Sequence, residues 1–84
     1  MSGRVREGRK LLRKSIELDP KNSLAYNDLG VSYMFTNDMK LHLAEWWLRK
    51  ALELDPTNKF ILNTWSSFEE VSAPFREKDG TDTD

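Results

Sequence analysis

Few residues of this chain have the types and spacing that catalysis or metal binding requires. His42 is the only histidine and no cysteine is present, so neither imidazole pairs nor thiolates can hold a metal ion. The sequence also lacks a glycine-rich phosphate-binding loop and a paired nucleophile and base. We therefore predict that the protein is not an enzyme and that it uses no metal and no cofactor.

Charged and aromatic residues remain as groups that could recognise a partner. Residues 4–14 contain six cations and one acid, Glu7. The cations are Arg4, Arg6, Arg9, Lys10, Arg13 and Lys14. Such a cluster is usually a solvated helix face, and the alternative is contact with RNA, an anionic surface or an acidic helix. The net charge of −1 and the lack of interleaved aromatic residues make nucleic acid the less favoured partner.

An internal duplication indicates the elements that position these residues. Residues 12–22 recur as residues 48–58, and eight of the eleven positions are identical. Each copy contains an Asp-Pro pair, Asp19-Pro20 and Asp55-Pro56, and the two pairs lie 36 residues apart. A repeat period of about 34 to 40 residues is typical of stacked helical hairpins. The sequence therefore predicts an all-α fold.

Apolar residues at helical spacing predict four helices. They occupy residues 4–18, 24–36, 39–54 and 59–72. The Asp-Pro pairs end the first and third helices, because proline disfavours the α conformation of the residue before it, and Pro74 is expected to end the fourth. Arg9 and Arg13 are expected on the polar side of the first helix. Gly30 costs the second helix about 1 kcal/mol relative to alanine, so we expect a facing helix to approach it closely.

The sequence predicts one small domain. We expect residues 1–3 to be flexible, residues 4–72 to form the helical domain and residues 73–84 to be a disordered acidic tail. No apolar run approaches the ~20 residues of a membrane span, and the N-terminus lacks the apolar region of a secretory signal. We therefore expect a soluble, intracellular and by default cytoplasmic protein.

Small and large apolar residues recur at set places through the middle of the chain. They are Ala25, Tyr26, Leu29, Gly30, Tyr33, Ala44, Leu48, Ala51 and Pro56. This pattern resembles the tetratricopeptide repeat, a helix–turn–helix unit of 34 residues. The first helix is similar to the second half of an earlier repeat, and the fourth to the first half of a later one. The resemblance implies antiparallel hairpins in a right-handed superhelical stack. The extra two residues, between Asp38 and Ala44, are expected to lengthen the start of the third helix.

The resemblance also implies a concave groove, lined by the first helix of each hairpin, that binds a peptide or a helix. In that register the groove residues are Leu24, Asn27, Asp28, Val31, Met34, Phe35, Phe60, Asn63 and Ser67. An asparagine can bond an extended backbone through its carbonyl and its amide, so Asn27 and Asn63 either position the ligand or are simply solvated. No cation lies in this set and Asp28 would repel a carboxylate, so we expect an apolar segment rather than a chain terminus.

Apolar residues beyond the expected core indicate contacts at the ends of the array. Trp46 lies among charged residues on the outer face of the third helix, where it either contacts a partner or covers Arg49 or Lys50. The fourth helix carries more apolar residues than one preceding hairpin would cover. The candidates for oligomer or end contacts are Trp46, Trp65, Phe68 and Val71.

These residues support three hypotheses. The first is a protein–protein interaction module that buries an apolar peptide or helix in the groove. The second is a scaffold that assembles into a homo-oligomer through its unfinished terminal helices. The third, which is less favoured, is nucleic-acid or anionic-surface binding through residues 4–14.

Overall fold

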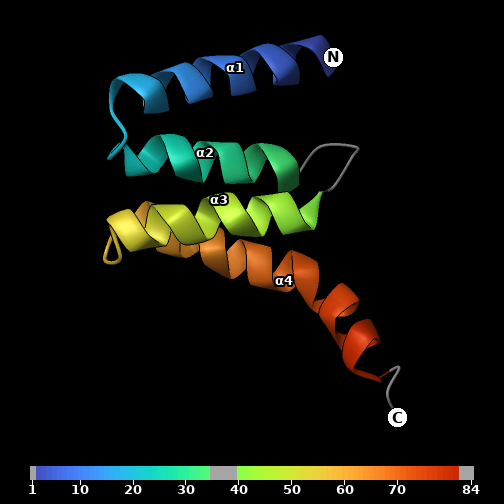
Figure 1. Cartoon of the computed structure of the whole chain (residues 1–84). Helices are drawn as coiled ribbons and strands as arrows, with labels where there is room; N and C mark the ends of the chain where they lie inside the picture. The colour runs from blue at the N-terminus through green and yellow to red at the C-terminus, as the bar shows by residue number, and fades with distance from the viewer. Residues whose placement is uncertain (1, 35–39, 82–84) are drawn as a thin grey trace.

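The computed structural model describes the backbone of residues 2–34 and 40–81 and the side chains of residues 4–34 and 40–74. It contains four helices and, within the described residues, no strand. The helices are α1 (Ser2–Leu18), α2 (Ser23–Met34), α3 (Leu41–Leu54) and α4 (Lys59–Thr81). Consecutive helices run back and forth in a stack with α1 at one end and α4 at the other (Figure 1). The prediction of an all-α array of helical hairpins is confirmed.

The two Asp-Pro turns begin the following helices in the same way. Asn22 Oδ1 accepts a hydrogen bond of 3.2 Å from the Ala25 amide, and Asn58 Oδ1 accepts one of 3.3 Å from the Ile61 amide, which is the corresponding position. A side-chain oxygen in this position satisfies an amide that has no partner within the helix. The duplicated sequence therefore produces a duplicated cap, at Asn22 for α2 and at Asn58 for α4.

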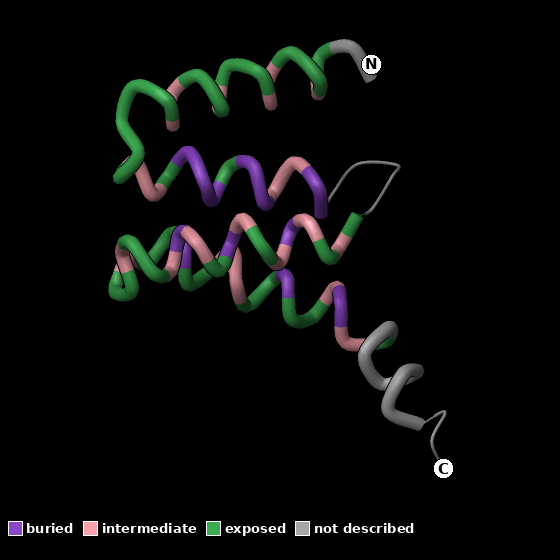
Figure 2. The backbone as a smooth tube through the Cα atoms, viewed as in Figure 1, coloured by how far each residue is buried: buried purple, intermediate pink, exposed green. Residues whose placement is uncertain are grey.

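The core is built around α2, which contacts each of the other three helices. Its predicted inner residues are all buried, and they are Ala25, Tyr26, Leu29, Gly30 and Tyr33. One cluster joins Tyr33 and Met34 to Ala44, Leu48 and Phe68, and a second joins Tyr26 to Ala51 and Ile61. Figure 2 shows the buried residues on α2 and on the sides of α3 and α4 that face the core, with none on the described part of α1.

Gly30 marks the closest approach of two helices. A methyl group placed on it would lie 2.6 Å from both Cγ and Cδ2 of Leu48 and 3.3 Å from the Ala44 carbonyl oxygen. Leu48 is fully buried, so it has little room to move away. The expected approach of a facing helix to Gly30 is therefore confirmed, and that helix is α3.

Two helix starts differ by two residues from the sequence prediction, and the start of α2 differs by one. α1 begins at Ser2 rather than at residue 4. α3 begins at Leu41 rather than at residue 39, and Lys40 precedes the helix. The two extra residues of the repeat therefore do not lengthen the start of α3. The predicted end of the second helix, at residues 35 and 36, lies outside the described residues.

The prediction that Pro74 ends the fourth helix is wrong. α4 continues through Pro74 to Thr81, and its last turns point away from the other helices (Figure 1). A proline inside a helix removes one backbone hydrogen bond and bends the helix, but the helix can continue beyond it. Residues 73–81 of the expected tail are thus helical, and residues 82–84 lie outside the described residues. A domain boundary after residue 72 stays a prediction.

We predict opposite effects on stability for alanine at Gly8 of α1 and at Gly30 of α2. In Gly30→Ala, overpacking of about 1–3 kcal/mol exceeds the gain of about 1 kcal/mol in helix propensity, so the free energy of unfolding should fall by about 1 kcal/mol. No heavy atom lies within 4 Å of a methyl added to Gly8, so Gly8→Ala should raise the free energy of unfolding by up to about 1 kcal/mol. Urea denaturation followed by circular dichroism measures both. A Gly30→Ala chain as stable as wild type would contradict the close approach.

Candidate functional site

A narrow strip of α2 stays open to solvent although most of that helix is buried. Leu24 and Asp28 are exposed and Val31 is half-buried, and their spacing of four and three residues places them on one face. On α4, which contacts α2, the exposed Phe60 and Ser67 stand at the positions that correspond to Leu24 and Val31 in the other repeat. We call these five residues the α2–α4 strip. The structure thus places eight of the nine predicted groove residues on two neighbouring helices, and five of the eight form this strip.

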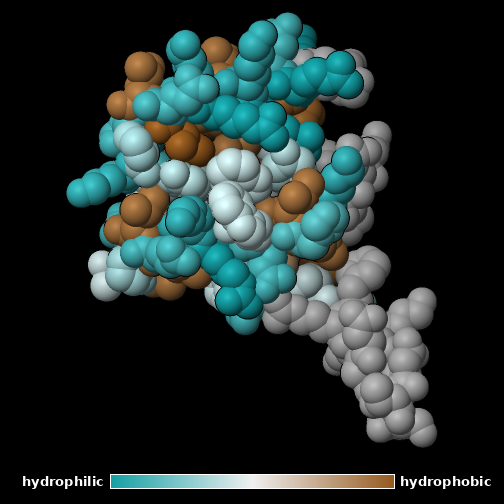
Figure 3. All heavy atoms as spheres, viewed as in Figure 1, coloured by the Kyte–Doolittle hydropathy of each residue, from teal (hydrophilic) through white to brown (hydrophobic). Residues whose placement is uncertain are grey.

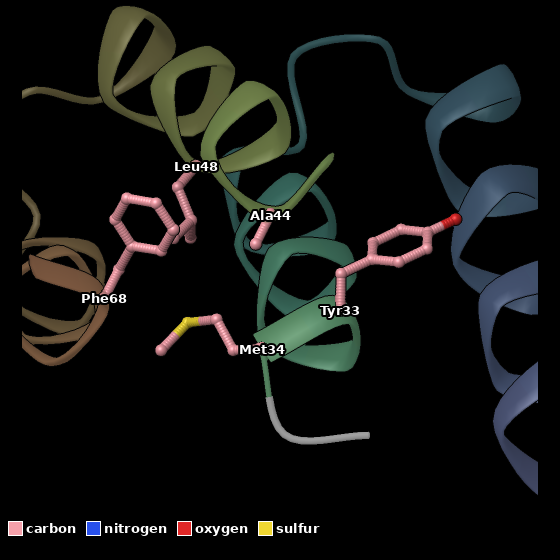
Figure 4. Close-up of a cluster of buried hydrophobic side chains, with 5 residues drawn as sticks. All are labelled: Tyr33, Met34, Ala44, Leu48 and Phe68. Carbon is pink, nitrogen blue, oxygen red and sulfur yellow. The ribbon is translucent and has the colours of Figure 1, made fainter. Parts of the chain in front are cut away.

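Two other predicted groove residues are buried. Met34 is only 1% exposed and packs with Phe68 of α4, and Figure 4 shows the two side chains pointing towards each other. Asn27 is 6% exposed and lies seven residues before Met34, on the same side of α2. This side of α2 therefore faces α4 rather than solvent. Asn63 is exposed on α4, and Phe35 lies outside the described residues.

Asn27 has an unsatisfied carbonyl oxygen. Its Oδ1 is the one buried side-chain nitrogen or oxygen atom without a hydrogen-bond partner in the part of the chain that is described. An unpaired buried acceptor costs about 1–3 kcal/mol, so such an atom needs an explanation. Asn27 is three residues from Leu24 and four from Val31, which makes it a helical neighbour of both. A hydrogen-bond acceptor therefore lies beside the α2–α4 strip.

The strip is mainly apolar. Phe60 is 73% exposed and Leu24 is 45% exposed, which are large fractions for side chains of this kind. Asp28 supplies the one charge in the strip, and it is negative. Apolar area with an acceptor at its edge suits an apolar segment that offers N–H groups, whereas a carboxylate would be repelled.

The family comparison concerns the same helices. Residues 11–45 match the family model described as tetratricopeptide repeat. This segment of the chain is therefore similar to the tetratricopeptide repeat. The matched segment runs from the middle of α1 through α2 into α3, so it includes the first Asp-Pro turn and Gly30. Neither the curated proteins nor the solved structures gave a match to the chain.

The tetratricopeptide repeat is in general a non-enzymatic motif that mediates protein–protein interaction. Within the described residues, no three His, Asp or Glu side chains gather in a way that could hold a metal ion. No helix in the same part of the chain is long and apolar enough to cross a membrane.

Two arginines attach α1 to α2. The Arg9 guanidinium lies 3.8 Å from the centre of the Tyr33 ring, and its Nε donates a 2.9 Å hydrogen bond to Ser32 Oγ. Arg13 Nη2 donates a 3.0 Å hydrogen bond to the Tyr33 hydroxyl, which points towards α1 in Figure 4. The prediction that Arg9 lies on the polar side of its helix is therefore wrong, because its half-buried side chain lies over the Tyr33 ring, whereas Arg13 is exposed and reaches Tyr33 only with its guanidinium. The four other cations of residues 4–14 are exposed, and they are Arg4, Arg6, Lys10 and Lys14.

The predicted end contacts fall into different environments. Trp46 is 56% exposed and lies edge-on to Trp47, with 4.8 Å between the ring centres. Trp65 is half-buried against Phe68, and the Arg49 guanidinium lies 5.7 Å from the centre of its ring. Arg49 and Trp65 line a shallow cleft with Leu52 and Glu53.

Phe68 is a core residue rather than surplus apolar surface. It is only 1% exposed, so the preceding hairpin covers more of α4 than the sequence pattern suggested. Val71 is half-buried beside the same cluster. Partner contacts at Trp46, Trp65 and Val71 stay predictions.

We predict that replacing Asn27 with leucine, which branches at the same carbon, stabilises the free chain. Removing a buried acceptor that has no partner should raise the free energy of unfolding by about 1 kcal/mol. Asn63→Leu is the matched control, because Asn63 occupies the corresponding position on α4 and is exposed, and it should change stability little. Urea denaturation measures both variants. A loss of stability in Asn27→Leu would show that the Asn27 carbonyl already has a partner.

Proposed function

We propose that this chain is an interaction module that holds an apolar peptide or helix along the α2–α4 strip. The observation that carries the proposal is the unpartnered Oδ1 of Asn27 beside exposed apolar side chains. Because Oδ1 is buried in the free chain, an N–H of a ligand would supply the missing hydrogen bond after the Asn27 side chain turned towards the strip. The apolar side chains beside it would supply most of the binding energy.

The size of the strip sets the expected affinity. Covering a large apolar side chain stabilises a complex by about 1.5–3 kcal/mol, and Phe60 and Leu24 are both exposed enough to gain part of this. A hydrogen bond to Asn27 adds about 1 kcal/mol. Association also costs several kcal/mol in lost freedom of motion. The balance corresponds to a dissociation constant in the micromolar range rather than the nanomolar range.

The charge of the strip narrows the ligand chemistry. Asp28 is exposed between Leu24 and Val31, so a ligand segment with apolar side chains and a lysine or arginine fits better than one with acidic residues. We expect peptides selected from a random display library to show this composition.

We predict that charge or loss of apolar area in the strip weakens peptide binding without unfolding the chain. A peptide selected on wild type should bind Val31→Glu and Phe60→Ser at least about tenfold more weakly, because each change removes about 1.4 kcal/mol or more. Met34 is unsuited to this test, since it is buried in the core. Trp46→Ser is the control, because Trp46 is a comparably exposed aromatic residue on α3. Equal binding to all four chains in a fluorescence titration would disprove the assignment.

We also predict that Asn27→Leu separates stability from binding. The variant should bind the selected peptide at least about fivefold more weakly, because the acceptor for the ligand N–H is gone, while it unfolds at higher urea. Unchanged peptide affinity would mean that Asn27 does not contact the ligand.

A further inference from the structure

α1 and α3 share sequence but differ in burial. Ala44 and Ala51 of α3 are fully buried against α2 and its neighbours, whereas the corresponding Gly8 and Ser15 of α1 are only half-buried. Trp47 of α3 packs against Tyr26 with 5.8 Å between the ring centres, but Leu11, its counterpart in α1, is 68% exposed. The side of α1 that matches the α2-facing side of α3 is therefore uncovered. This open α1 face comprises Gly8, Leu11, Ser15 and Leu18.

α4 shows the complementary difference from α2. In α2, Tyr26, Gly30 and Tyr33 are buried. The residues of α4 at the corresponding positions, 36 further along the chain, are all exposed. They are Leu62, Ser66 and Glu69, and we call them the open α4 face. α4 therefore has a face like the one that α3 covers on α2, and no helix covers it.

The two open faces lie at opposite ends of the stack, as Figure 2 shows for α1 and α4, and Figure 3 shows apolar patches reaching the surface near α1. The open α1 face belongs to a helix of the α3 type, which comes second in a hairpin. The open α4 face belongs to a helix of the α2 type, which comes first. We propose that α1 of one copy docks on the open α4 face of another copy, so that a helical hairpin forms between the two chains. This inference does not depend on the proposed function of the α2–α4 strip.

The packing of the intact hairpin can be repeated between chains. The Trp47–Tyr26 contact becomes a contact between Leu11 and Leu62, both of which are exposed in the free chain. In the intact hairpin Gly30 admits Leu48, whereas the contact between chains would set the larger Ser66 against Leu12, the counterpart of Leu48. The two helices would therefore pack further apart between chains than α2 and α3 do within one chain.

Charge favours a head-to-tail contact over pairing of like ends. Glu69 and Glu70 of α4 are exposed and stand at the positions of Tyr33 and Met34, which in α2 pack near the start of α3. The start of α1 carries Arg4 and Arg6, with Glu7 as its only acid. Two α4 helices would bring four carboxylates together, and two α1 helices would bring two basic clusters together. A contact between α1 and α4 places the carboxylates near the arginines.

Because the two faces are different, the contact cannot close on itself in a simple dimer. A heterologous contact leaves one unused face at each end of every complex, so chains add in series unless the rotation closes a ring. The mass of wild type should therefore rise continuously with concentration.

Two blocked chains test the proposal. Leu11→Glu spoils the open α1 face and Leu62→Glu spoils the open α4 face, and both leucines are exposed enough for the fold to tolerate the change. Each variant alone should be monomeric up to about 1 mM, and a one-to-one mixture should form a dimer and nothing larger. Sedimentation velocity gives the masses, and circular dichroism checks the folding. Leu24→Glu is the matched control, since Leu24 is an exposed leucine outside both faces, and it should assemble like wild type.

The other results would overturn the proposal. If Leu11→Glu alone formed a stable dimer, α4 would pair with α4, and if Leu62→Glu alone did so, α1 would pair with α1. A mixture that stayed monomeric, or a wild-type chain that stayed monomeric at about 1 mM, would show that the faces do not bind each other. Raising the salt from about 50 to about 500 mM should weaken the mixed dimer, because exposed charges are screened at short range. A mixed dimer that bound more tightly at high salt would contradict the attraction between the carboxylates of Glu69 and Glu70 and the arginines of α1.

Discussion

The contact between Gly30 and Leu48 sets the positions of all four helices. It lets α2 and α3 approach until Leu48 lies against the α2 backbone, and this fixes the hairpin. The same Leu48 forms a cluster with Phe68, which holds α4, and with Tyr33, which also contacts α1 through Arg9. Because α2 touches every other helix, a shift in this one contact would be transmitted to both ends of the stack.

The sequence predicted those features that depend on local chemistry. The duplicated Asp-Pro-x-Asn segment determines where two helices start, since a turn and a cap need only a few neighbouring residues. The closeness of α3 to Gly30 followed from the cost of glycine in a helix. The helix that continues past Pro74 could not be predicted in the same way, because proline fixes its own backbone but not the strength of the helix on either side.

The sequence did not predict which neighbouring helix covers each side of a given helix. Periodicity identifies an apolar side but gives no distance between helices, so Met34 and Asn27 looked as exposed as Val31. Only the packing of Phe68 between α2 and α3 shows that this side of α2 is covered. Arg9 was misplaced for a related reason, since a long side chain can leave a polar face and lie on a neighbouring aromatic ring.

Because Arg9 and Arg13 attach α1 to α2, this helix can open without unfolding of the other helices. α1 has no buried residue among its described side chains, and it is held on α2 by these polar contacts and by Ile16, which packs against the core. Opening α1 therefore exposes little apolar area, so its free energy of opening lies well below that of global unfolding. The amide protons of α1 would exchange with solvent by this local route, whereas those of α2 around Leu29 would exchange only when the whole stack unfolds. The molecule thus behaves as a cooperative unit of α2, α3 and the packed part of α4, to which α1 is reversibly attached.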